Sequence, residues 1–247
     1  MDKIISAITA FVDEYKSVML SKGRLDFLLM GLGNTFLITF GALAIGIVLG
    51  IIVASVRSSY DKNKESLKLR GGIGYRILSV LNAICKFYIT VTRGTPVVVQ
   101  LFIMFLIVFA SADEPEPVAI LAFGINSGAY VAEIFRSGIM SVDHGQFEAG
   151  RSLGFNYFQT MRFIVIPQMF KAVLPTLCNE FIALLKETSV VGYIGAIDLT
   201  KAGNTIAGRT FEYVIPLMTV ALVYLTIVMA LSWLVGILER RLRKSDR

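Results

Sequence analysis

Long apolar stretches separated by short polar ones dominate the chain. Five of them are about as long as the roughly 20 residues that a helix needs to cross the hydrocarbon core of a bilayer. Four of these stretches are charge-free for most of their length, whereas the fourth in order carries two prolines and several charges. The pattern predicts an all-α integral membrane protein of five transmembrane helices. The expected spans are 27–56, 81–112, 117–140, 163–185 and 213–238.

Polar segments flank these spans. Residues 1–26 carry apolar side chains at roughly helical spacing, which predicts an amphipathic helix on the outer surface of the membrane. Residues 57–75 are polar and contain glycines, so we expect a cytoplasmic loop between the first two spans. The chain then divides into the extracytoplasmic segment 1–26, a transmembrane domain over 27–240 and a basic cytoplasmic tail over 241–247.

The composition agrees with a membrane protein. Apolar residues make up 55% of the chain and charged residues only 17%, against about 25% charged residues in soluble domains. The net charge of +6 does not indicate nucleic acid binding, because basic residues gather in the cytoplasmic loops of membrane proteins. We therefore expect a bilayer rather than nucleic acid as the surroundings of this chain.

The distribution of charge also orients the spans. Basic residues lie between the first two spans and again after the last span, whereas the link 113–117 is acidic and has no basic residue. The positive-inside rule places the basic groups in the cytoplasm and the acidic link outside. With an odd number of spans, the N-terminus is expected outside and the C-terminus inside. The segment 143–162 then lies on the cytoplasmic side.

This cytoplasmic segment predicts a short helix with defined ends. Asp143 and Gln146 have the spacing of a capping box at the start of the helix, and Gly154 suits the left-handed position that ends one. Asn156 and Gln159 form a second candidate capping box, which begins a helix that runs toward the next span.

The same segment resembles the cytoplasmic signature of permeases of ATP-binding-cassette (ABC) importers. That signature reads Glu-Ala-Ala, three residues, Gly, nine residues, Ile-x-Leu-Pro, and two positions depart from it here: Gly150 replaces the second alanine and Ile166 the leucine. In that family the loop forms a coupling helix that contacts an ATPase subunit. The resemblance implies ATPase-coupling roles for Glu148, Ala149, Gly150, Gly154 and Pro167.

Other segments resemble the polar amino acid permeases of the histidine, glutamine and arginine type. They are 93–102, 127–136 and 185–189, and the resemblance as a whole covers about 27–240. It implies the type I importer permease fold, with a five-helix core and a cytoplasmic coupling helix, in the bacterial inner membrane. It also implies three protein partners: a second permease copy or paralogue, an ABC ATPase and an extracytoplasmic substrate-binding protein. The sequence contains no Gly-Lys pair and hence no P-loop, so we expect ATP-Mg to bind the partner ATPase and no cofactor to bind this chain.

Ionisable residues inside a membrane usually face a bundle interior or a wet cavity. Asn126, Tyr130 and Glu133 share one face of the third span, and Pro96 predicts a bend that could expose backbone groups to a substrate. Both signs of charge along a path suit a zwitterion such as an amino acid. Alternatively, these charges form structural pairs, Lys171 or Lys186 reaches the interface, or Arg93 holds a lipid phosphate. The candidate pathway residues are Arg93, Thr95, Asn126, Tyr130, Glu133, Glu180 and Lys186.

Two other classes of function compete with an ABC permease. An ion-gradient-driven secondary transporter of small zwitterionic solutes predicts internal repeats with matching broken helices, and no second copy of any span is evident. An intramembrane enzyme needs a metal-binding or nucleophile motif, and the chain has none. The single His144 and the two isolated cysteines offer no metal site and no disulfide framework.

Overall fold

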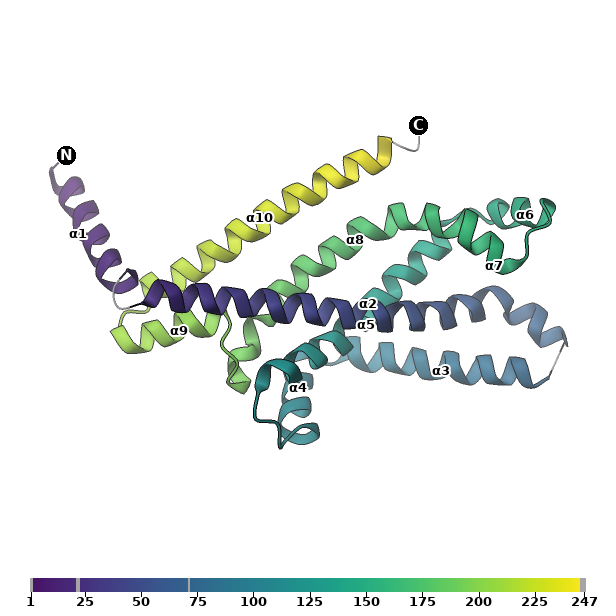
Figure 1. The fold of residues 1–247 in the computed structure, drawn as a ribbon, viewed down its shortest axis with the longest axis horizontal. Helices are drawn as coiled ribbons and strands as arrows, with labels where there is room; N and C mark the ends of the chain where they lie inside the picture. Colours follow the sequence, from purple (N-terminus) through teal and green to yellow (C-terminus); the bar gives the residue numbers. More distant parts are fainter. Residues whose placement is uncertain (1, 21–22, 71, 245–247) are drawn as a thin grey trace.

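The computed structural model describes residues 2–20, 23–70 and 72–244, and no strand lies among them. The long helices α2, α5, α8 and α10 run along the longest dimension of the molecule (Figure 1). In chain order the elements are α1 (Asp2–Met19), α2 (Arg24–Arg70), α3 (Ile73–Gly94), α4 (Val97–Phe102), a π-helical turn (Ile103–Val108), α5 (Pro115–Ser141), α6 (His144–Ser152), α7 (Tyr157–Thr160), a second π-helical turn (Met161–Val165), α8 (Ile166–Glu187), a 3-10 helix (Thr188–Ile194), α9 (Leu199–Thr210) and α10 (Val214–Lys244).

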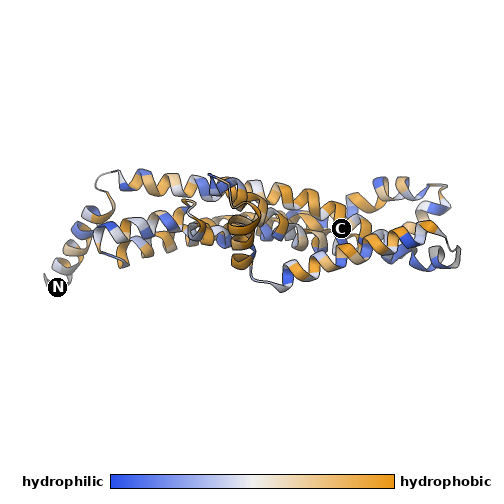
Figure 2. Ribbon diagram, turned by 90° about the horizontal axis from the view of Figure 1, so that it is seen from below, coloured by the Kyte–Doolittle hydropathy of each residue, from blue (hydrophilic) through white to orange (hydrophobic). Residues whose placement is uncertain are grey.

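Four helical stretches are long and apolar enough to cross a membrane, and the bent pair α3–α4 makes a fifth if it is counted as one span. The middle parts of the long helices are mostly hydrophobic (Figure 2). Helices α6 and α7 lie at the same end of the molecule as the C-terminal end of α2, whereas α1 and α9 lie at the opposite end (Figure 1). The expected number of spans is therefore confirmed.

Small residues bring α2 and α5 together in the most extensive helix pair of the molecule. A Cβ atom added to Gly50 of α2 would lie 2.5 Å from Cγ1 of Val131, and one added to Gly124 of α5 would lie 2.7 Å from Cβ of Ile45. Each helix thus offers glycines to the larger side chains of the other, the arrangement that lets membrane helices pack closely. Helices α3 and α8 pack against both members of this pair.

The expected cytoplasmic loop over 57–75 is wrong for most of its length. Helix α2 has 47 residues and continues without a break to Arg70. At 1.5 Å per residue it is about 70 Å long, more than twice the thickness of a hydrocarbon core. The residues after Val56 include lysines, a glutamate and leucines, which favour a helix, and no glycine or proline interrupts them before Gly71. Gly71 itself lies outside the described residues.

The second span, expected over 81–112 with a bend at Pro96, is longer than predicted and sharply bent. Helix α3 already begins at Ile73, and the axes of α3 and the segment 97–108 meet at 107°. The bend falls where proline chemistry requires it: Thr95 has the extended backbone that a residue before proline adopts, and Pro96 stands just before the first turn of α4. The predicted bend is confirmed, and it turns the second half of this span across the bundle.

The fourth span begins earlier than predicted, because α7, a π-helical turn and α8 form one continuous stretch over 157–187. In the π-turn the N–H of Ile166 donates to the carbonyl of Met161, and the helix accommodates Pro167 one residue later. A second proline, Pro175, is kept inside α8. Membrane helices tolerate such prolines where local adjustments satisfy the freed backbone groups.

The two ends of the chain are also helical. Helix α1 covers Asp2–Met19 of the segment 1–26 in which a helix is expected, with exposed apolar side chains at Ile5, Ile8 and Phe11. Its last turn buries Val18 and Met19 in a cluster that includes residues of α9 and α10. At the other end, α10 continues into the expected tail as far as Lys244, and residues 245–247 lie outside the described part of the chain.

Candidate functional site

The predicted coupling segment (143–167) begins with a cap on α6. The Asp143 Oδ1 atom accepts a hydrogen bond of 2.6 Å from the backbone N–H of Gly145. Gln146 does not return the bond that a capping box requires. Its Oε1 instead accepts a hydrogen bond of 3.1 Å from Nε2 of Gln168 in α8. The predicted capping box is therefore only half correct, and the second half of the pair ties α6 to the following span.

The end of α6 is closed as the sequence predicts. Gly154 has φ of +79°, and its N–H bonds the carbonyl of Arg151 at 2.9 Å while the N–H of Phe155 bonds the carbonyl of Gly150 at 3.0 Å. This pair of bonds is the Schellman arrangement that ends a helix at a left-handed glycine. The second capping box is confirmed directly afterwards, at Asn156 and Gln159.

The structure explains why glycine stands at position 150, where the ABC importer signature has alanine. A Cβ atom there would lie 2.8 Å from both Cγ2 and Oγ1 of Thr160, which is buried. Gly150 therefore lets α6 lie directly against α7. The neighbouring Glu148 and Ala149 are exposed at the end of the molecule, and Pro167 is exposed in the first turn of α8. The segment thus presents one face outward and packs the other against the transmembrane helices.

A cleft of about 490 Å³ lies between α3, α5 and α8. It brings together four of the seven predicted pathway residues, which come from three different helices: Arg93, Tyr130, Glu133 and Glu180. Its remaining lining consists of Ile134, Ser137, Gly138, Ser141, Ala172 and Thr176.

The charges of this cleft differ in how far they are compensated. The Arg93 guanidinium lies 5.0 Å from the centre of the Tyr130 ring and lines the same cleft as Glu133 and Glu180. Glu180 accepts one hydrogen bond of 2.8 Å from the hydroxyl of Ser127. Glu133 is bound by two arginines, Arg57 of α2 and Arg136 of α5. Arg93 and Glu180 are therefore the two charges of the cleft best placed to meet a ligand.

Thr95 and Asn126 do not line the cleft but hold the bend beside it. The amide of Gln100 joins them: its Nε2 donates to Oγ1 of Thr95 at 2.7 Å, and its Oε1 accepts from Nδ2 of Asn126 at 3.0 Å. The same Nε2 donates to the carbonyl of Thr92 at 2.8 Å. This network fastens α4 across the end of α3 and onto α5. Sequence analysis missed Gln100, although its place four residues after Pro96 was the available signal.

Lys186 lies outside the cleft. It lines a separate cavity of about 230 Å³ together with Ser189, Thr200 and Tyr224, among others. Six residues separate Lys186 from Glu180, which is about 240° around a helix at 100° per residue, so the two side chains leave α8 in different directions. The prediction of Lys186 as a pathway residue is not supported by its position.

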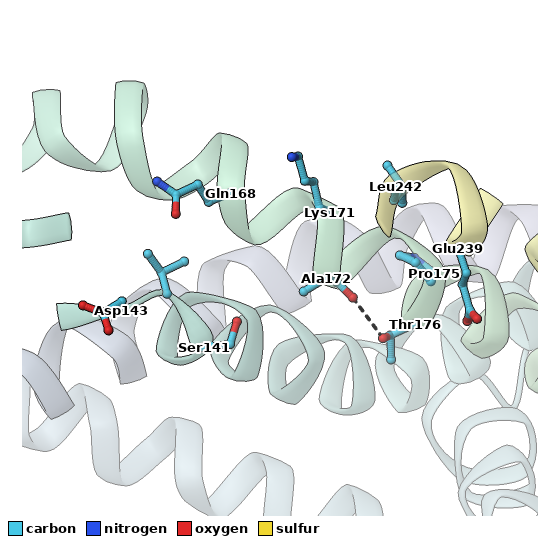
Figure 3. A pocket seen from close by; sticks show the side chains of 10 residues that line it. Ser141, Asp143, Gln168, Lys171, Ala172, Pro175, Thr176, Glu239 and Leu242 are labelled. Carbon is cyan, nitrogen blue, oxygen red and sulfur yellow. Dashed lines mark hydrogen bonds between the residues drawn. The ribbon is translucent and has the colours of Figure 1, made fainter. Parts of the chain in front are cut away.

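A second cavity of about 530 Å³ shares Ser141, Ala172 and Thr176 with the cleft and leads from it toward α6. Figure 3 shows Ser141 and Asp143 across this space from Gln168 and Lys171, with Glu239 of α10 at its edge. Sequence analysis missed Gln168 and Thr176 in this lining, although they share a face of α8 at a spacing of two turns. Taken together, the linings of the two cavities reach from Arg93 to Asp143 at the start of the coupling segment. Among the described residues, no three His, Cys, Asp or Glu side chains are grouped so that they could hold a metal ion.

Membrane-length helices around a charged cleft, with a capped helix at one end, are the features of a multi-pass membrane protein. The sequence model of one protein family, described as the binding-protein-dependent transport system inner membrane component, matches residues 71–244. The chain belongs to this family.

Individual relatives agree with the family match. The chain is 33% identical over 226 residues to the arginine transport system permease protein ArtQ of Bacillus subtilis (strain 168), covering 90% of this chain and 95% of that protein. It is 36% identical over 187 residues to the putative glutamine transport system permease protein GlnP of Rickettsia bellii (strain RML369-C), covering 67% of this chain and 83% of that protein.

Solved structures share the fold. One described as the crystal structure of an amino acid ABC transporter with histidines superposes with a TM-score of 0.75 at 36% identity, over 88% of this chain and 94% of that chain. An inward-facing structure of the MetNI methionine ABC transporter superposes with a TM-score of 0.72 at 19% identity, over 90% and 99%, and supports the fold alone. The predicted type I ABC importer permease fold is confirmed, and the chain is a transport subunit rather than an enzyme. The alternative of a secondary transporter is not favoured.

Proposed function

We propose that this chain is the permease subunit of an ABC importer that carries a polar or charged amino acid across the bacterial inner membrane. The observation that carries the proposal is the pair of opposite charges in the cleft, Arg93 and Glu180. Family membership supports the importer, and relatives named for arginine, glutamine and L-cystine transport support the amino acid.

The charges of the cleft suit the two ends of an amino acid. A guanidinium binds a carboxylate with two parallel hydrogen bonds, so Arg93 would hold the α-carboxylate of the substrate. The free oxygen of Glu180 would accept from the ammonium group. Glu133 contributes little net charge to the cleft, because Arg57 and Arg136 already bind its carboxylate. A zwitterion therefore fits the remaining charges better than a sugar or a lone metal ion.

The partners follow from the same proposal. An ABC ATPase, which holds ATP-Mg, would dock on the exposed face of α6 at Glu148 and Ala149, while Gly150, Gly154 and Pro167 shape the segment behind it. A second permease, either another copy or a paralogue, would complete the transport pathway. A substrate-binding protein would deliver the amino acid at the opposite end, beside α1. This orientation places the N-terminus outside and the C-terminus in the cytoplasm.

The first test is a pull-down of the tagged native chain in mild detergent, followed by mass spectrometry and by transport assays of the complex in liposomes. We expect an ATPase with a P-loop to copurify, to be lost from the Glu148→Lys variant, and to drive uptake of an amino acid supplied with its binding protein. N-acetylated and carboxamide derivatives of that amino acid should not compete for uptake. A homo-oligomer without ATPase that moves solute under an ion gradient would overturn the proposal.

A further inference from the structure

Glu133 is the central residue of a series of ion pairs that connects the cleft to α2. Its Oε1 is bound by Nη1 of Arg57, and its Oε2 accepts from Nη2 of Arg136 at 2.9 Å and from Nε of the same residue at 3.1 Å. Nη1 of Arg136 in turn lies 3.4 Å from Oδ2 of Asp61. Arg57 and Asp61 are one turn apart on α2 and therefore share a face of that helix. This series of ion pairs thus joins Glu133 in the cleft to the part of α2 that extends beyond the apolar span.

The residue after Asp61 makes the next contact, with α6. The Nζ atom of Lys62 lies 3.4 Å from the centre of the Phe147 ring. This Nζ is buried, and no hydrogen-bond partner for it exists among the described residues. Phe147 is 9% exposed, whereas His144 and Glu148 on the same short helix are largely exposed. A desolvated ammonium over an aromatic face is a stabilising cation–π contact, although burial still lowers the pKa of Lys62 to about 8.

The contact between Lys62 and Phe147 lies beside a cavity at the junction of α5 and α6. Helix α5 ends at Ser141, and Val142, with its extended backbone, leads to the start of α6. A cavity of about 490 Å³ lies between the end of α5, α6 and α2, with Asp61, Lys62 and Phe147 among its lining. The direct connection from α5 to α6 is therefore a non-helical joint beside an open space. The helical extension of α2 provides a second connection to α6, through the contact of Lys62 with Phe147.

We propose that Asp61 and Lys62 are positioning residues that link α6 to the cleft through α2. A displacement of α6 moves Phe147 and hence Lys62, and the same helix carries Arg57 and Asp61, which hold Glu133 directly and through Arg136. Movement of the ATPase-docking helix is thereby transmitted to a side chain that lines the cleft. This inference rests on the proposed function, because it assumes that an ATPase moves α6.

The test compares variants of Lys62 in the complete importer in liposomes. The quantity measured is the number of ATP molecules hydrolysed for each amino acid imported, together with the KM for the loaded binding protein. We expect Lys62→Met to raise the ratio by about fivefold or more, at the lower end of typical coupling between sites, with KM unchanged. Lys62→Arg, which keeps the cation over the ring, should keep the native ratio. Lys64→Met, two residues further on at an exposed position, is the matched control and should also keep it.

A second pair of variants addresses the other half of the link. Asp61→Asn should raise the same ratio, and Asp61→Glu, which restores the charge facing Arg136, should return it toward the native value. Copurification of the ATPase with each variant shows that the complex is assembled. If Lys62→Met fails to assemble, the Asp61 pair decides the matter.

The outcomes separate this inference from the proposed function. If import of the amino acid by the native complex does not depend on ATP, the proposed function itself is overturned. A native complex with tight coupling, and assembled Lys62→Met and Asp61→Asn variants with the native ratio, would overturn only the positioning roles. Loss of coupling in Lys64→Met to the same extent would also overturn them, because the effect would then follow basic charge rather than the contact with Phe147.

Discussion

The coupling segment and the cleft are built in different ways. Hydrogen bonds between residues at most five positions apart define the ends of α6 and α7, as between Phe155 and Gly150 or between Gln159 and Asn156. The cleft instead depends on partners far apart in the chain, such as Ser127 and Glu180, which are 53 residues apart. The first region is shaped by backbone conformation and the second by the placement of charge. Substitutions should therefore affect the first through helix geometry and the second through electrostatics.

The largest expected effect is in the cleft, from Glu180→Gln. The change keeps the shape and the hydrogen bond with Ser127 but removes the carboxylate charge that would bind the substrate ammonium. Because a hydrogen bond to a charged group contributes about 1.5–3 kcal/mol, uptake should fall by about tenfold to a hundredfold, with assembly intact. Uptake of the amino acid into liposomes measures this. Glu114→Gln, at an exposed position outside the cleft lining, is the control and should transport normally.

Backbone conformation should decide the next effect, at Gly154. A Cβ atom there meets nothing within 4 Å, so its φ of +79° is the only obstacle to a side chain. Gly154→Val should destabilise the end of α6 by about 1–2 kcal/mol, the cost of a left-handed residue, and weaken retention of the ATPase. Gly154→Asn should be tolerated, because asparagine adopts this conformation readily. Equal loss of the ATPase in both variants would contradict this account.

Position 150 separates helix propensity from packing. Intrinsic propensity predicts that Gly150→Ala stabilises α6 by up to about 1 kcal/mol. The structure predicts the opposite, because the new Cβ would lie 2.8 Å from Thr160 and overpacking costs about 1–3 kcal/mol. Thermal unfolding of the purified protein should show a lower midpoint for Gly150→Ala, and a restored one when Thr160→Ala is added. A higher midpoint for the single variant would mean that α6 and α7 do not pack closely in solution.

The difference between short-range contacts in the coupling segment and long-range contacts in the cleft explains which features the sequence could predict. The caps at Asp143, Asn156 and Gly154 were predictable because each depends on residue types a few positions apart. Polarity alone does not distinguish the helical extension of α2 from a loop, because lysine and glutamate favour helices as well as water. No local pattern shows that Arg57 and Glu133 meet, since their contact depends on how α2 packs on α5.

The cleft was predicted in part for the same reason. Tyr130 and Glu133 were found because they share a face of one helix, and Asn126 shares that face too but lies where Gln100 of α4 covers it. Arg93 of α3 and Glu180 of α8 join them only because these helices pack beside α5, which no pattern within a single span shows. Helical periodicity within a span thus identifies which residues face together, but not which neighbouring element they face.

The smallest effect is expected at Lys186, and it tests the boundary of the cleft. Lys186 and Glu180 both lie on α8, but Lys186 is exposed and lines a different cavity with Ser189 and Tyr224. Exposed substitutions usually change free energies by no more than about 0.5 kcal/mol, so Lys186→Gln should alter uptake by about twofold at most. Uptake measured beside Glu180→Gln under identical conditions gives the comparison. A loss as large as that of Glu180→Gln would mean that the substrate passes along the other face of α8, and that the charges around Arg93 serve to hold the helices together.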